Sequence, residues 1–209
     1  MKPLAQLSRH VPDAFALQEL MNAVEKKYTV QDAPAQVRTL NFYDSFDWRL
    51  YTAGLLCFEQ DGRLRLSDLI GQEIVPSLVI PGETPGFCRH LPDSALQKKI
   101  APVLEMRTLL LQSSFTLTTR RLRILNKEKK TVAILVPAEL SAGDEQPVCS
   151  VRLHAVRGYE KWFQRLQQDL ENIGRSQPGT KEQELKTALA IKGRKPQEYS
   201  SKFNVVLQP

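Results

Sequence analysis

The sequence predicts a mainly β protein of the α+β class, built as an antiparallel sheet or barrel with appended helices. Four consecutive strand patterns lie between residues 106 and 156, and only short connections separate them. About seven or eight strands are predicted along the whole chain against three or four helices, with few of the strand–helix–strand alternations that a parallel sheet needs. The 209 residues, 42% hydrophobic and 25% charged, are enough to bury a core without disulfides or a structural metal.

The N-terminal part of the chain predicts a weak strand, a helix and a second strand. The weak strand covers residues 3–10, and Asp13 then has the side chain of a helix N-cap. The helix is expected to run to about Lys26, and the segment 37–43 alternates as a strand does. Apolar residues follow at helical spacing: Phe15, Leu17, Leu20, Met21 and Val24.

A hairpin and a long loop are expected next. The strands 55–58 and 63–66 flank Asp61-Gly62, a dipeptide typical of tight hairpin turns. Residues 71–92 are rich in proline and glycine, so we expect mostly loop there, with one short strand at 77–80.

The second half of the chain carries the clearest β signal. A helix is predicted from Asp93 to Leu104, with Pro102 ending it early. Four strands are then predicted: Met106–Ser113, Phe115–Leu125, Thr131–Val136 and Val148–Val156.

Helical patterns dominate the C-terminal part. An apolar stripe predicts a helix over 159–173, which Gly174 ends. Residues 176–179 are then expected to form a linker, followed by a modest helix over 181–191 and a polar tail.

The charge and the cysteines limit the possible partners and location. The chain has 29 Lys and Arg against 23 Asp and Glu, a net charge of +6, which permits phosphate-rich partners. Residues 107–165 alone carry eleven basic and five acidic residues. Three widely spaced cysteines predict free thiols in a reducing compartment. No stretch is apolar enough for a signal peptide or a membrane span, so we expect a cytoplasmic protein with no membrane partner.

Common catalytic motifs are missing from the sequence. It contains no glycine-rich phosphate loop, no Gly-x-Ser-x-Gly and no His-Glu-x-x-His. The three histidines, His10, His90 and His154, are scattered. Cys149 and His154 are five residues apart on one predicted strand and so would point to opposite faces, which disfavours a Cys/His nucleophile.

Arginines supply the most informative pattern. Alternate residues of a strand share a face, so Arg121 and Arg123 are expected to project together, as are Arg63 and Arg65. Arg152 and His154 share a face in the same way, and Arg107 opens the first strand of the long meander. Inside a barrel these faces would form a cationic lumen that binds phosphate oxygens; on the outside they would be ordinary solvated positions.

The segment Phe42–Leu55 (FYDSFDWRLYTAGL) resembles the CYTH family, also called triphosphate tunnel metalloenzymes. The resemblance covers roughly residues 3–175 and is greatest to the branch fused to a CHAD domain, a helical bundle associated with polyphosphate. Further matching segments are Thr119–Arg123, Lys130–Val132 and Val151–Tyr159.

This resemblance implies an antiparallel eight-stranded tunnel with appended helices over residues 1–175. It also implies that residues 176–209 form a linker, a helix and a connector toward a CHAD bundle that the chain lacks. The family carries Glu-x-Glu-x-Lys on its first strand, where the glutamates bind Mg²⁺ or Mn²⁺. We place this signature at Ala5-x-Leu7-x-Arg9, where both glutamates are lost. An alternative placement at Ala23-x-Glu25-x-Lys27 keeps one glutamate but lies within a predicted helix.

We therefore expect a non-catalytic tunnel domain that binds or positions polyphosphate- or triphosphate-like anions beside a CHAD domain of the same longer chain. No catalytic residue, metal ligand or cofactor is expected. One alternative is a CYTH triphosphatase or adenylate cyclase, which would need Mg²⁺ or Mn²⁺. The other is a purely structural or dimerisation domain that uses the helix over 159–173. Nucleic acid is an unlikely partner because aromatic residues are not interleaved with the basic ones. The predicted phosphate-binding residues are Arg65, Arg107, Arg121, Arg123 and Arg152.

Overall fold

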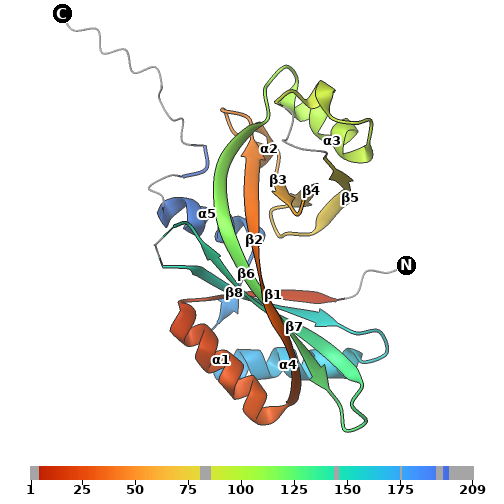
Figure 1. The fold of residues 1–209 in the computed structure, drawn as a ribbon, viewed down its shortest axis with the longest axis vertical. Helices are drawn as coiled ribbons and strands as arrows, with labels where there is room; N and C mark the ends of the chain where they lie inside the picture. Colours follow the sequence, from red (N-terminus) through yellow and green to blue (C-terminus); the bar gives the residue numbers. More distant parts are fainter. Residues whose placement is uncertain (1–4, 81–85, 144–145, 175, 192–194, 198–209) are drawn as a thin grey trace, which may run out of the picture.

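The strands form one antiparallel sheet in the computed structural model, which describes residues 5–80, 86–143, 146–174, 176–191 and 195–197 (Figure 1). Its order is β5-β4-β3-β2-β6-β7-β8-β1-β9, and every neighbouring pair is antiparallel. The strands are β1 (Gln6–Val11), β2 (Thr29–Asp44), β3 (Leu55–Gln60), β4 (Arg63–Asp68), β5 (Glu73–Val79), β6 (Leu110–Leu125), β7 (Thr131–Ser141), β8 (Val148–Ala155) and β9 (Gln177–Pro178).

The mainly β, antiparallel architecture with appended helices is confirmed, but a closed eight-stranded barrel is not. The sheet has nine strands, and within the described ranges its two edge strands, β5 and β9, do not pair with each other. The ninth strand is only two residues long and adds to the outer edge of β1. A turn-rich sequence gives no direct signal for such a short strand, because its pairing depends on a distant partner.

The two longest strands, β2 and β6, run side by side along the molecule (Figure 1). At one end they join β3, β4 and β5, and at the other they join β7, β8 and β1. The predicted strand 37–43 was too short, because residues 29–36 also pair with β6 through a bulge between Ala33 and Gln36. The predicted break at Ser114 was wrong: pairing to β2 continues through it.

The helices are α1 (Ala14–Lys27), α2 (Arg49–Thr52), α3 (Ala95–Leu104), α4 (Glu160–Ile173) and α5 (Lys181–Ile191), with a 3-10 turn at Cys88–His90. Asp13 caps α1 as predicted, since its carboxylate accepts a hydrogen bond from the backbone N–H of Ala16 at 2.7 Å. Pro102 does not end α3 early. It lies in the last turn, where the lost hydrogen bond is offset by complete burial of Ile100 and Leu104.

Three apolar clusters hold the helices on the sheet. One joins α1 and α4 to β6, β7 and β8, and another joins α3 to β3 and β4. The stripe of α4 belongs to the first cluster, where Phe163, Leu166 and Leu170 are buried. This stripe is therefore core and is not available to a dimerisation partner. None of the described helices is long and apolar enough to cross a membrane.

Candidate anion-binding face

Alternation of side chains gives the sheet two faces. Leu122 of β6 and Leu153 of β8 point toward α1 and α4 and pack with them. Their sequence neighbours therefore point to the opposite side, which we call the inner face. Backbone pairing places Arg123 opposite Ile134, and Ile134 opposite His154, so these three residues share the inner face.

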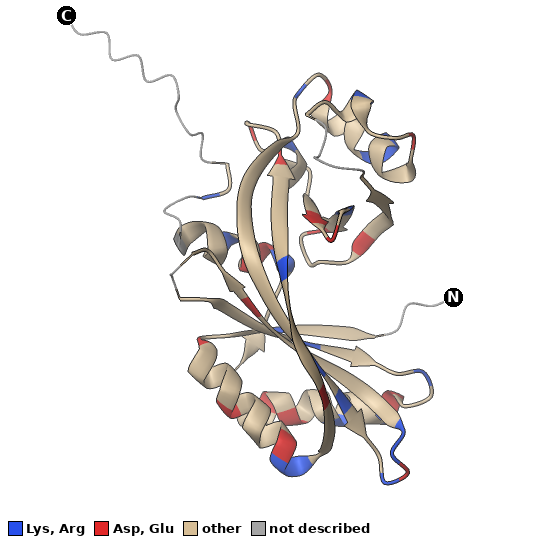
Figure 2. Cartoon of the chain, in the orientation of Figure 1, with Lys and Arg blue, Asp and Glu red and all other residues tan. Residues whose placement is uncertain are grey.

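Four cationic or titratable side chains gather on the inner face of β6 and β8: Arg121, Arg123, Arg152 and His154. The pKa of His154 is lowered first by burial and then by the positive charges of Arg152 and Arg121. Arg121 and Arg123 are exposed, whereas Arg152 is half-buried. Figure 2 shows Lys and Arg residues on the half of the sheet that contains β6, β7 and β8, and in the hairpin loops of that half. Spacing alone predicted the pair Arg121 and Arg123 and the pair Arg152 and His154; the strand pairing of β6, β7 and β8 puts the two pairs on one face.

Several buried polar atoms on the inner face make no hydrogen bond with other described residues. The Nε atoms of Arg65 and Arg152 and the hydroxyl oxygens of Ser67 and Ser113 are buried, and none has a hydrogen-bond partner among the described residues. Buried polar groups usually find partners. Unused donors on this face are consistent with a polar ligand or water.

Arg65 lies on the inner face of β4, in the other half of the sheet. It pairs with Phe58 of β3, whose ring packs with Phe42 of β2. Its Nη1 atom is 3.9 Å from a carboxylate oxygen of Glu73. Arg65 therefore shares the face of the other arginines but has an acidic partner of its own.

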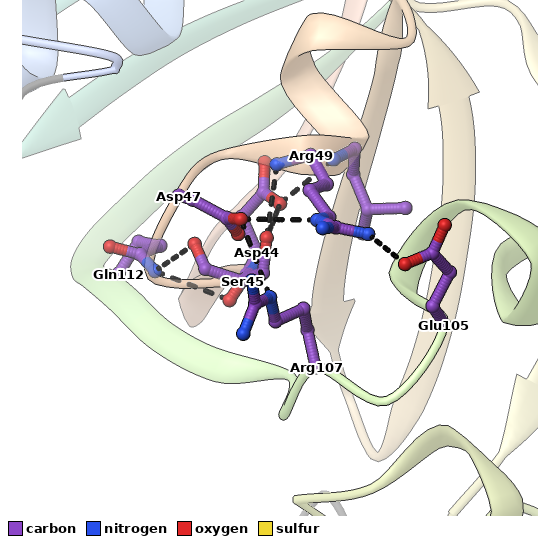
Figure 3. A network of polar contacts seen from close by, with 8 residues as sticks. Asp44, Ser45, Asp47, Arg49, Glu105, Arg107 and Gln112 are labelled. Atoms are coloured by element: carbon purple, nitrogen blue, oxygen red, sulfur yellow. Dashed lines mark hydrogen bonds and ion pairs between the residues drawn. The ribbon is translucent and has the colours of Figure 1, made fainter.

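Arg107 lies away from this face, in the connection from α3 to β6. Its Nε atom is 3.5 Å from a carboxylate oxygen of Asp47 (Figure 3). Its guanidinium lies 5.0 Å from the ring centre of Phe46. Arg49 also contacts Asp47, at 3.0 Å, and reaches Glu105 at 2.7 Å. Arg107 is thus part of a polar network at one end of the molecule.

That network surrounds the motif that carries the resemblance, at the corner between β2 and β3. The buried carboxylate of Asp44 accepts hydrogen bonds from the backbone N–H groups of Ser45, Leu50 and Tyr51, at 2.7–2.9 Å. The amide of Gln112 donates to the carbonyl oxygens of Asp44 and Ser45 (Figure 3). Burial raises the pKa of Asp44, although these hydrogen bonds act in the opposite direction. The described hydrogen bonds of this motif hold the backbone of the corner between β2 and β3 in place.

The first strand turns different residues inward from those expected. Pairing to β8 places Ser8 opposite Arg152 and His10 opposite Ser150, so the inward positions are Gln6, Ser8 and His10. The expected positions, Leu7 and Arg9, point to the outer face. There the Nε atom of Arg9 donates to the Ser176 hydroxyl at 2.7 Å. Leu7 and Arg9 of the expected signature therefore do not point inward, and β1 contains no glutamate. The alternative placement, 23–27, lies in α1.

Helix α5 covers part of the inner face, which the sequence did not predict. Leu185, Ala188 and Leu189 are buried in an apolar cluster with residues of the sheet. The strand residues of this cluster are Leu40 and Phe42 of β2, Leu56 of β3, Phe115 and Leu117 of β6, Ala138 and Leu140 of β7, and Val148 of β8. The apolar end of the inner face is thus closed by a helix, while the arginines of β6 lie beyond it.

The segment before α5 and the first residues of the helix, 176–182, connect the two halves of the sheet. The N–H of Gly179 donates to the carbonyl of Ser8 on β1 at 3.1 Å. The N–H of Glu182 donates to the carbonyl of Leu69, just after β4, at 2.9 Å. The described part of the predicted linker therefore packs with the sheet. The predicted connector at 198–209 lies outside the described residues.

Two residues of α5, Lys181 and Glu184, form a largely buried ion pair. Lys181 Nζ is 3.0 Å from Glu184 Oε2, and these side chains are only 13% and 11% exposed. The ammonium also lies 5.4 Å from the ring centre of Phe58. Burial would raise the pKa of Glu184, but the charges of Lys181 and Arg152 and a hydrogen bond with Ser150 outweigh it, so the pKa is lowered. Glu184 is therefore a carboxylate that faces the arginine cluster.

The inner face does not fit a divalent metal. Mg²⁺ and Mn²⁺ prefer carboxylate and other oxygen ligands. In the part of the chain that the structure describes, no three His, Cys, Asp or Glu side chains cluster as metal ligands would. On the inner face of β1 the residues are a glutamine, a serine and a histidine.

Comparison with known proteins supports the fold. No protein-family model and no curated protein sequence matches the chain. Among solved structures, the chain is similar to a candidate adenylyl cyclase from Hippeastrum with a dominant triphosphatase activity, at a TM-score of 0.54 and 14% identity, covering 93% of this chain and 98% of that one. A candidate adenylate cyclase from Bacillus halodurans gives a TM-score of 0.52 and 13% identity, covering 85% of this chain and 93% of that one. The chain thus has a CYTH-like fold.

Proposed function

We propose that this chain is a non-catalytic CYTH-like domain that binds or positions polyphosphate- or triphosphate-like anions on its inner face. The observation that carries the proposal is the group formed by Arg121, Arg123, Arg152 and His154 on one face of the sheet. Guanidinium groups bind phosphate oxygens with two parallel hydrogen bonds, and a chain of phosphates offers several such contacts.

The state of these arginines favours binding of an external anion. No ion pair joins Arg121, Arg123 or Arg152 to a carboxylate at contact distance among the described salt bridges. By contrast, Arg120, which points to the outer face, is paired with Asp32. On β6, the outer-face arginine is therefore paired with a carboxylate, whereas the inner-face arginines keep N–H donors for a ligand.

The donor set supports binding rather than metal-dependent catalysis. An enzyme that cleaves a triphosphate with Mg²⁺ or Mn²⁺ needs carboxylates to hold the metal near the phosphates. The inward positions of β1 supply none. The described residues also offer no cluster of metal ligands elsewhere.

A metal-dependent triphosphatase or adenylate cyclase is the second candidate. It is favoured by the fold, because the structural neighbours are candidate cyclases and one has a dominant triphosphatase activity. Release of phosphate from tripolyphosphate with Mg²⁺ or Mn²⁺, abolished by a chelator, would establish this candidate in place of the first. A structural domain that only positions a neighbour would show neither binding nor release.

A matched pair of substitutions on β6 tests the proposal. Arg121→Ala removes an inner-face cation, and Arg120→Ala removes the same charge from the outer face of the same strand. We expect Arg121→Ala to weaken tripolyphosphate binding by about tenfold, which corresponds to the loss of about one charged hydrogen bond. Arg120→Ala should weaken it much less. Isothermal titration calorimetry at fixed ionic strength measures both, and equal effects would contradict binding at the inner face.

The neighbouring CHAD domain belongs to the same proposal. Basic residues outnumber acidic ones in the segment 175–209, by seven to three. We propose that this segment leads toward a helical polyphosphate-binding bundle in a longer chain. Tighter polyphosphate binding by the longer chain than by residues 1–209 would support this arrangement.

A further inference from the structure

Glu184 is the acidic side chain that α5 places against the cationic part of the inner face. It is 9% exposed as a residue, and its carboxylate is held by Lys181 of the same helix. α5 packs on the inner face through Leu185 and Leu189, which share an apolar cluster with Val148 of β8, two positions before Ser150 and four before Arg152. Arg152 and Ser150 also lower the pKa of the Glu184 carboxyl. These two residues are two positions apart on β8 and therefore lie side by side on the inner face.

A buried carboxylate requires partners, because its removal from water is unfavourable unless charges and hydrogen bonds compensate. Lys181 provides one ion pair to the Glu184 carboxylate. Arg152 adds a second positive charge near it. The Nε atom of Arg152 has no hydrogen-bond partner among the described residues. The field of Arg152 is thus shared between Glu184 and any anion that reaches Arg121 and Arg123.

We propose that Glu184 acts as a tethered competitor for the anion, so that binding at Arg152 weakens the docking of α5, and docking of α5 weakens the binding. This inference rests on the proposed function. Two negative groups near one guanidinium repel each other. A phosphate at Arg152 must therefore either tolerate Glu184 or displace it, and by linkage the effect is the same in both directions.

The test uses Glu184→Gln, which keeps the size and removes the charge. Glu182→Gln is the matched control: it makes the same charge change on the same helix, but its side chain contacts Tyr51 and Lys186. We expect Glu184→Gln to bind tripolyphosphate about fivefold or more tightly than the wild-type chain, the lower end of ordinary coupling between sites. Glu182→Gln should remain close to wild type. Calorimetric titration of the 209-residue chain measures this, and thermal melting confirms that each variant is folded.

Hydrogen exchange gives a second readout for the wild-type chain. If the coupling exists, tripolyphosphate increases exchange at the backbone amides of α5. Unchanged or slower exchange there at saturating tripolyphosphate would overturn it.

The outcomes separate this inference from the proposed function. If the wild-type chain binds through Arg121 and Glu184→Gln binds no more tightly than Glu182→Gln, the competitor role is wrong and the binding site stands. If none of the variants binds tripolyphosphate, both are wrong. If Glu184→Gln binds more tightly and α5 exchanges faster with ligand, both are supported.

Discussion

Asp44 holds the corner between β2 and β3. The residue is 4% exposed, and its carboxylate accepts hydrogen bonds from three backbone N–H groups, two of them from the start of α2. Those N–H groups have no partner within the helix, as at any helix N-terminus. The motif around Asp44 therefore stabilises the fold, and this explains why a resemblance centred on it indicates the fold more directly than the chemistry.

Replacing Asp44 by Asn should destabilise the protein without altering its anion site. One carboxylate oxygen becomes an NH₂ group, which cannot accept a hydrogen bond from a buried backbone N–H. We expect the free energy of unfolding to fall by about 1–3 kcal/mol, the cost of an unsatisfied buried donor. Urea unfolding at neutral pH measures this change. An unchanged unfolding midpoint would contradict the structural role of Asp44.

Individual site residues were predictable only where one strand determines them. Arg121 and Arg123 share a face because they are two residues apart, and no tertiary information is needed. Arg107 could not be placed in this way, because its surroundings are set by the connection from α3 to β6 and by Asp47. The sequence did not identify Glu184 as a neighbour of the arginines, because the apolar pattern of a helix does not indicate which face of the sheet the helix covers.

At the scale of elements, α5 and the segment before it determine how open the inner face is. Gly179 approaches β1 so closely that a Cβ atom would lie 2.7 Å from the backbone nitrogen of His10. In the other half of the sheet, just after β4, a Cβ at Gly71 would lie 3.1 Å from the Cβ of Lys181. Two glycines thus allow this segment to pack at both of its ends.

Substituting Gly179 by Ala should loosen this packing. The added methyl meets backbone atoms of Arg9 and His10, which cannot move as a side-chain end could. We expect a loss of about 1–3 kcal/mol in the free energy of unfolding, as for other overpacked positions. Gln177→Ala, at an exposed position of the same segment, is the control. Equal stability of the two variants in thermal melts would show that the close approach does not matter.

The docking of α5 should depend on pH through Glu184. Because its pKa is lowered below the ordinary value of 4.5, its contribution to stability is present above that pH and is lost as pH falls through the native pKa. The wild-type chain should therefore exceed Glu184→Gln in unfolding free energy above pH 4.5. That difference should shrink in more acidic solution. Denaturant titrations at several pH values measure it, and a difference independent of pH would argue against the ion pair.

Elements with strong local signals were predicted, and those that depend on distant pairing were not. The cap of α1, the stripe of α4 and the hairpin at Asp61 follow from local residues. By contrast, the first half of β2 is polar and contains Pro34, and it is a strand because β6 lies beside it. The two-residue β9 likewise exists through its pairing with β1.

At the scale of the whole molecule, the fold and the charge lead to different expectations. The fold is that of candidate cyclases, one with a dominant triphosphatase activity, at 14% and 13% identity. The charge of the inner face is positive, and its first strand offers no carboxylate to a metal. This difference is the basis of our proposal that the inner face binds a polyanion, because metal-dependent cleavage needs ligands that hold the metal near the phosphates.

The most direct measurement is calorimetric titration of the wild-type chain with tripolyphosphate in the presence of a chelator. We predict saturable binding without added metal, weakened by added salt because the contacts are charged, and no release of phosphate during the titration. Binding that appears only with Mg²⁺ or Mn²⁺, or the absence of binding under all these conditions, would contradict it.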